Sequence, residues 1–77
     1  MNDMEKLLGI LRDICPDVDF ESETALIDDG LIESLDLVSI VNEIIADFDV
    51  VFNVDDLLPE NFNSAESILA LIHKKQG

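Results

Sequence analysis

The spacing of the apolar residues constrains the fold of this chain more than any other feature, because in three segments it follows the period of an α-helix. The first segment runs from about Asn2 to Cys15; Asn2 or Asp3 can cap its start, and Pro16 ends it. We therefore expect an amphipathic helix with one buried face. Its apolar residues are Met4, Leu7, Leu8, Leu11, Ile14 and Cys15.

A second helix is predicted from Ser34 to Phe48 or Asp49. Its apolar stripe is wide, and Leu35 and Val38 fall to one side of it, so the first two turns are more hydrophobic than one core face requires. This excess indicates a docking surface beside Ser34. The stripe itself consists of Leu37, Ile40, Val41, Ile44, Ile45 and Phe48.

The last third of the chain predicts two further helical segments. A short helical turn is expected near residues 54–58, and Pro59 is expected to stop it. The final helix should start at Asn63 or Ser64, because Asn63 and Glu66 are spaced like a capping box. Two lysines close this helix, and its core face consists of Ala65, Ile68, Leu69 and Ile72.

Residues 16–33 show no sustained period, but their apolar side chains should pack the segment across the bundle. The alternating stretch from Asp47 to Phe52 is the one strand-like run, and Phe48 fits the helical period better. Three good helices, one short helix and no sustained alternation predict an all-α fold, a small four-helix bundle in which residues 1–77 form a single domain.

The chain is strongly acidic, with a formal net charge of -14 from 18 acidic and 4 basic residues. Nucleic acids and anionic membranes bind through basic side chains, so neither is an expected partner. We also expect no membrane insertion, because no apolar run approaches about 20 residues. A cytoplasmic location is expected because no secretory signal is evident, and the chain is expected to be a monomer. Protein partners should present basic docking patches.

Two residues that often carry chemistry have ordinary interpretations here. Cys15 is the one cysteine, and it is expected to be a small buried hydrophobic residue. His73 is the one histidine; it should lie in solvent on the last helix, far in sequence from Ser34. A serine needs a base to become a nucleophile, so we expect no serine–histidine hydrolase and no enzyme.

The start of the second helix has an unusual setting. An acidic loop, Asp28-Asp29-Gly30-Leu31, is followed by Glu33-Ser34-Leu35-Asp36 and Val38, and the helix ends at Asp47-Phe48. This pattern resembles the modification motif of acyl carrier proteins and extends to most of the chain. Serine is also a common N-cap, and capping alone is the simple alternative interpretation of Ser34.

The resemblance implies a fold, a cofactor and partners. The fold would be a four-helix bundle of the acyl-carrier type, with Ser34 carrying a 4'-phosphopantetheine arm whose thiol holds acyl or aminoacyl groups as thioesters. A phosphopantetheinyl transferase would attach the arm. A loading ligase and a downstream synthase or transferase would then dock on the chain, and the docking residues would be Glu33, Leu35, Asp36 and Val38.

Departures from the family pattern bear on the cargo. Most members have aspartate at the position of Glu33, and carriers of fatty acid biosynthesis have glutamates where this chain has Ser39, Ile45 and Ala46. The segment 58–64 resembles D-alanyl carrier proteins instead. The alternatives are therefore a D-alanyl or peptidyl carrier of a specialised pathway, and the well-filled core favours short acyl or aminoacyl cargo.

Two rival functions remain from other classes. A calcium loop beginning at Asp17 would need glycine at its sixth position and glutamate at its twelfth, where the chain has Ser22 and Asp28, so no metal site is expected. An acidic decoy that binds basic surfaces without a cofactor would explain the charge. It would not explain the setting of Ser34.

Overall fold

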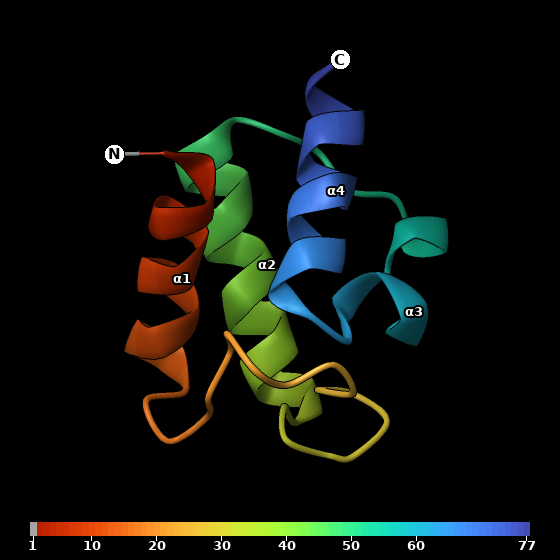
Figure 1. Cartoon of the computed structure of the whole chain (residues 1–77). Coiled ribbons are helices and arrows are strands. Elements are labelled where there is room, and N and C mark those ends of the chain that lie inside the picture. Colours follow the sequence, from red (N-terminus) through yellow and green to blue (C-terminus); the bar gives the residue numbers. More distant parts are fainter. Residues whose placement is uncertain (1) are drawn as a thin grey trace.

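The computed structural model describes residues 2–77 and contains only helices and loops in that part of the chain (Figure 1). It confirms the prediction of a small all-α bundle. The elements are α1 (Asp3–Ile14), α2 (Ser34–Phe48), a 3₁₀ turn η1 (Val54–Asp56), the short α3 (Pro59–Phe62) and α4 (Ala65–Gln76).

The first two helices begin and end where the sequence predicted. The side chain of Asn2 caps α1 by accepting a hydrogen bond from the backbone N–H of Glu5 at 2.8 Å. Phe48 belongs to α2 and is buried, so the alternating stretch is not a strand. The helix ends at Phe48, and its C-cap residue, Asp49, adopts the left-handed conformation with φ 54°.

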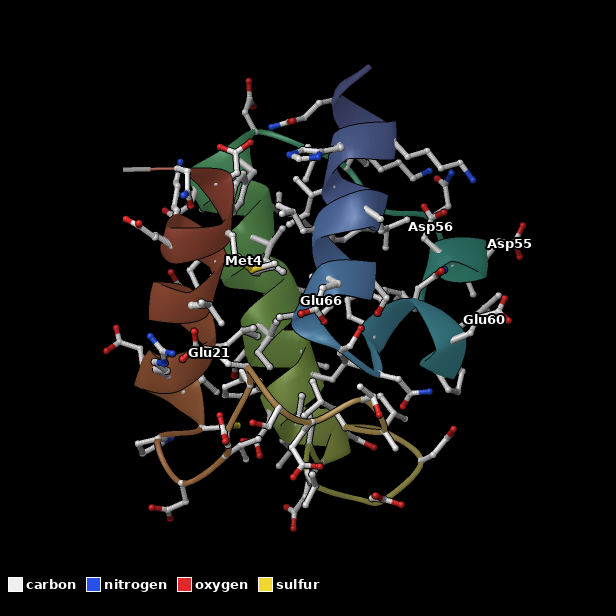
Figure 2. The ribbon with its side chains drawn as sticks, viewed as in Figure 1. Met4, Glu21, Asp55, Asp56, Glu60 and Glu66 are labelled. Carbon is white, nitrogen blue, oxygen red and sulfur yellow. The ribbon has the colours of Figure 1, made fainter. Side chains whose placement is uncertain are left out.

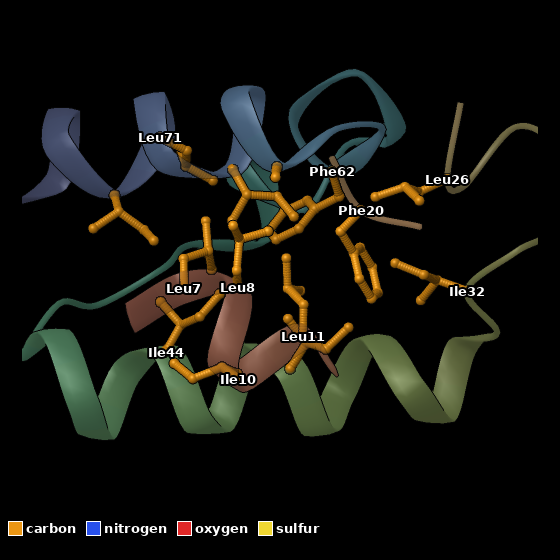
Figure 3. Close-up of a cluster of buried hydrophobic side chains, with 14 of the residues drawn as sticks. Leu7, Leu8, Ile10, Leu11, Phe20, Leu26, Ile32, Ile44, Phe62 and Leu71 are labelled. Atoms are coloured by element: carbon orange, nitrogen blue, oxygen red, sulfur yellow. The ribbon is translucent and has the colours of Figure 1, made fainter. Parts of the chain in front are cut away.

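The core lies between α1, α2 and α4 (Figure 3). Phe20, Leu26 and Ile32 from the long loop, with Phe62 of α3, fill the end of the core nearest the start of α2. Phe52 packs edge-on against Phe62, with ring centroids 6.2 Å apart. The radius of gyration of 11.2 Å agrees with the ~11.5 Å expected for a folded chain of this length. The fully buried aliphatic residues are Leu7, Leu11, Leu26, Ile40, Ile44, Ile68 and Ile72.

The structure corrects two expectations in the last third of the chain. Pro59 does not end a helical turn but occupies the first turn of α3, where its missing N–H is not needed. The N-cap of α4 is Ser64 rather than Asn63, and its capping-box partner is Ser67 rather than Glu66. Ser64 and Ser67 each accept a hydrogen bond from the backbone N–H of the other.

One ion pair and one histidine–carboxylate contact hold the last turns of α4 to the rest of the bundle. The Lys75 ammonium lies 2.6 Å from Asp56, whose carboxylate also accepts a hydrogen bond from the Asn53 backbone N–H. In Figure 2, Asp56 turns toward α4, whereas the neighbouring Asp55 points outward. His73 is at the surface, as predicted, and its ring lies 2.9 Å from Asp3 of α1.

The helices are arranged so that α1 begins and α4 ends at one end of the bundle, opposite the start of α2 (Figure 1). The long loop that precedes α2 crosses the bundle at the same end as the start of α2. Within residues 2–77, none of the helices has both the length and the apolar character needed to cross a bilayer.

Candidate functional site

The loop that leads to Ser34 is anchored by Asn63, from the turn between α3 and α4. The side-chain oxygen of Asn63 accepts hydrogen bonds from the backbone N–H groups of Ile27 and Asp28, at 3.0 and 3.1 Å. Its amide nitrogen donates to the Asp28 carboxylate at 3.1 Å, and its backbone carbonyl accepts from Leu26 at 2.9 Å. One residue, through its side chain and its backbone carbonyl, therefore fixes the loop against the other half of the bundle.

A tight turn then delivers the chain to the start of α2. Gly30 has φ 71°, a conformation that most L-residues avoid and glycine adopts readily. The carbonyl of Leu26 accepts hydrogen bonds from the backbone N–H groups of Leu31 and Ile32. Because Ile32 is buried and Leu26 is fully buried, the turn is packed as well as hydrogen-bonded.

Ser34 is the first residue of α2 and is exposed to solvent. The N-cap is Glu33, whose side chain makes no capping hydrogen bond, and the Ser34 hydroxyl has no hydrogen-bond partner among residues 2–77. The interpretation of Ser34 as a simple N-cap is therefore wrong. Ser64 provides the contrast, because its hydroxyl caps α4 by accepting from the Ser67 N–H.

The backbone at the start of α2 favours an anion, whereas the flanking Glu33 and Asp36 carboxylates oppose one. The first hydrogen bond of the helix runs from the Leu37 N–H to the Glu33 carbonyl, and no side chain caps the preceding N–H groups. Such N–H groups and the helix dipole favour a phosphate near a helix N-terminus. A phosphodiester on the Ser34 oxygen would lie beside them.

The carboxylates that flank the serine act on Cys15, which lies under the first turn of α2. Burial raises the pKa of the Cys15 thiol, and the nearby Asp36 carboxylate, with a smaller effect from Glu33, raises it further. Cys15 is buried, as the sequence predicted. It is therefore held as an unreactive neutral thiol near neutral pH, since the thiolate is the nucleophilic form.

The apolar surface predicted beside Ser34 is present. Leu35 is 81% exposed and Val38 is 57% exposed, on the first two turns of α2. Of the predicted docking residues, Glu33 is also exposed, whereas Asp36 is half-buried against the Cys15 side. The structure brings these residues and Ser34 together simply because they share one helix start.

A second group of exposed apolar residues was missed in the sequence. Val54 of η1 is 86% exposed, and Leu57 and Leu58, which precede α3, are 40% and 44% exposed. The sequence did contain a signal for this group, namely two consecutive leucines directly before Pro59. In this connection Asp56 is buried while the apolar residues are exposed, so the leucines are not explained by the core.

The acidic segment that begins at Asp17 is shaped by turns and one ion pair. Glu21 lies 2.8 Å from the Arg12 guanidinium, and its backbone N–H donates to the Asp19 side chain. Within residues 2–77, no group of three or more histidine, cysteine or acidic side chains is placed to hold a metal ion.

No protein-family model matches the sequence, and a comparison with curated proteins finds no similar protein.

Proposed function

We propose that this chain is a carrier of the acyl carrier type, in which Ser34 bears a 4'-phosphopantetheine arm. The observation that carries the proposal is the contrast between two serines at helix starts. Ser64 uses its hydroxyl to cap α4, whereas the Ser34 hydroxyl is exposed and makes no hydrogen bond. A hydroxyl available to an enzyme on a fixed helix start is what such a modification requires.

The chemistry of attachment needs little from the carrier itself. The Ser34 oxygen would form a new bond to the phosphorus of coenzyme A that carries the pantetheine, and the pyrophosphate bond would break so that adenosine bisphosphate leaves. The serine proton would pass to a base of the phosphopantetheinyl transferase. The one histidine of the chain does not lie near Ser34, because His73 contacts Asp3 at the other end of the bundle.

The protonated state of Cys15 supports a thioester carrier. A thioester on the arm would be lost by transfer to any reactive thiolate nearby, with the sulfur–carbon bond reforming on the second sulfur. Burial and the charges of Asp36 and Glu33 raise the pKa of the Cys15 thiol and suppress that thiolate. The one protein thiol would therefore not compete with the thiol of the arm.

The filled core favours short acyl or aminoacyl cargo, which includes the D-alanyl and peptidyl carrier alternatives. Phe52 and Phe62 pack edge-on, and Phe62 is fully buried where α3 closes the bundle. A long acyl chain would have to displace such side chains, whereas an amino acid thioester can remain in solvent. A melting temperature that rises steadily with acyl length in the loaded protein would instead support long-chain cargo.

The modification is tested by intact mass. The protein is incubated with coenzyme A, magnesium and a broad-specificity phosphopantetheinyl transferase, and one phosphopantetheine adduct is expected. The adduct should be absent in Ser34→Ala. It should persist in Ser64→Ala, the matched control, which loses a helix cap worth about 1 kcal/mol but keeps the proposed site.

The rival is an acidic decoy that binds basic proteins and carries no cofactor. If several such transferases give no adduct on folded protein, the carrier proposal is wrong and the decoy is favoured. The decoy would then show tight binding to a basic protein that weakens steeply with salt.

A further inference from the structure

A surface groove follows the outer seam between α1 and α2, away from the residues around Ser34. Its volume is about 520 Å³. Gly9, Ile10 and Ile14 of α1 give it an uncharged base, in which Ile10 is buried and Ile14 is half-buried. Neither Ser34 nor its exposed apolar neighbours line this groove.

Gly9 is the unexplained residue of this groove. It lies in the interior of α1, where glycine weakens a helix relative to alanine. A Cβ atom added to Gly9 would meet no atom within 4 Å, and the backbone there is helical, so nothing within the fold requires glycine. The remaining physical effect of glycine is to let another backbone approach α1 closely at this point.

The rims of the groove carry four carboxylates. Glu5 and Asp13 come from α1, and Glu43 and Asp47 come from α2. None of the four takes part in the ion pairs found within residues 2–77. The rims are thus acidic on both helices.

The one basic side chain at the groove is already held in place. The Lys6 ammonium donates a hydrogen bond to the backbone carbonyl of Asp47 and lies 4.7 Å from the centre of the Phe48 ring. It therefore serves the carbonyl end of α2, where the helix dipole favours a cation. Four carboxylates against one engaged ammonium leave the groove with an excess of negative charge.

We infer that this groove docks an amphipathic helix of a partner protein, with an apolar stripe against Ile10 and Ile14 and lysines or arginines over both acidic rims. Charge complementarity selects a basic partner, and it disfavours a second copy of this acidic chain. The groove extends from Glu5 to Ile14, roughly 13 Å of helix, which matches two to three turns of a docked helix. Gly9 removes the side chain that would hold the two helix backbones apart.

This inference is independent of the modification of Ser34. The groove and the Ser34 surface use different residues, so a partner could remain in the groove while the start of α2 stays open to another protein. The test is therefore made on unmodified protein, and its result does not depend on the outcome of the mass experiment.

The probe is a synthetic peptide of about 14 residues, helical over ~21 Å, with a leucine stripe flanked by arginines on both sides. Its control has the same composition in scrambled order. Both are titrated into ¹⁵N-labelled protein at low salt, and the backbone amide shifts are followed. The ordered peptide should perturb Gly9, Ile10 and Glu43 most, and the scrambled peptide should bind about tenfold more weakly.

Gly9→Gln is the diagnostic variant, because it places a long side chain in the groove while improving the helix propensity of α1. It should weaken binding of the ordered peptide about tenfold or more and should not lower the melting temperature. Ala70→Gln is the matched control, since Ala70 is exposed on α4 outside the groove, and its affinity should equal that of the wild type. Asp13→Asn with Glu43→Gln should weaken binding about tenfold and flatten its salt dependence.

Several results would overturn the inference. One is an equal effect of Gly9→Gln and Ala70→Gln on the affinity of the ordered peptide. Another is that the largest amide shifts occur at Leu35 and Val38 or at residues 54–58. The inference is also wrong if the scrambled peptide binds as tightly as the ordered one, or if the ordered peptide does not bind. Shifts in the groove that grow with protein concentration without peptide would assign the groove to a second copy, against the inference.

Discussion

Replacing Asn63 with alanine should loosen the loop that leads to Ser34. The variant loses two hydrogen bonds to the backbone N–H groups of Ile27 and Asp28 and one to the Asp28 carboxylate. Each such bond contributes about 0.5–1.5 kcal/mol net, and the two at exposed Asp28 lie at the low end because water replaces them. We expect a loss of about 1–2 kcal/mol in the free energy of unfolding.

Urea unfolding followed by circular dichroism measures this loss. In a domain of this size, 1 kcal/mol corresponds to about 4–8 °C in melting temperature, so a thermal scan gives a second reading. Asn42→Ala is the matched control, because Asn42 is exposed on α2 and should change stability by less than about 0.5 kcal/mol. The backbone hydrogen bond from Leu26 to residue 63 remains in the variant, so the loop should loosen without complete release.

The functional effect follows from the same anchor. If the loop positions the start of α2, Asn63→Ala should also slow phosphopantetheinylation of Ser34 at temperatures where the protein is fully folded. An Asn63→Ala protein as stable as Asn42→Ala would refute the reasoning, because it would show that the packed turn holds the loop without these hydrogen bonds.

Three further predictions concern the thiol, the docking surface and acid stability. At neutral pH, a maleimide should label the arm thiol of modified protein but label Cys15 only after unfolding, because the pKa of the Cys15 thiol is raised; mass spectrometry of digested protein would show rapid labelling of folded Cys15 if this were wrong. Leu35→Ala should speed dissociation of the transferase with little loss of stability, whereas Asp36→Asn should slow association and weaken its salt dependence; stopped-flow kinetics giving the same rate effects for both would contradict this division. The Lys75 ammonium lowers the pKa of the Asp56 carboxyl, so the stability from this carboxylate is present above its usual pKa of about 3.9 and is lost as pH falls through the lowered value. The stability advantage of the wild type over Asp56→Asn should therefore shrink in urea unfolding below about pH 4, and a constant advantage would refute the role of the pair.

The parts of the fold that the sequence predicted well are those set by local periodicity. The bounds of α1 and α2 follow from an unbroken apolar stripe and from Pro16, which ends the first helix. The helical period also predicted that Leu35 and Val38 are exposed, since both fall outside the apolar stripe of α2. Such features depend on neighbours three and four residues away.

The features that were missed depend on contacts distant in sequence. Asn63 looked like an N-cap, but its side chain reaches residues 27 and 28, and no local pattern reveals contacts between residues 36 and 35 positions apart in the sequence. The capping pair is Ser64 with Ser67, and it has the same three-residue spacing as the predicted pair of Asn63 with Glu66. The spacing therefore does not tell the two pairs apart. Pro59 is ambiguous in any sequence, since proline both ends helices and begins them.

The groove beside Gly9 belongs to the same group. The glycine is visible in the sequence, but whether a Cβ would collide with a neighbour depends on how α1 packs on α2. The availability of the Ser34 hydroxyl likewise depends on which residue becomes the N-cap of α2, and Glu33 takes that position.

The placement of the chain ends has a practical consequence for handling this protein. Because α1 begins and α4 ends opposite the start of α2, a tag, a dye or a surface linker at either end lies across the bundle from Ser34. The bundle measures 29 Å along its two longer axes and 19 Å along the third. Molecules immobilised through either end would present Ser34 to the solution in one orientation, which suits sensor measurements with modifying enzymes. A neighbouring domain joined through a flexible linker at either end would likewise leave the start of α2 uncovered.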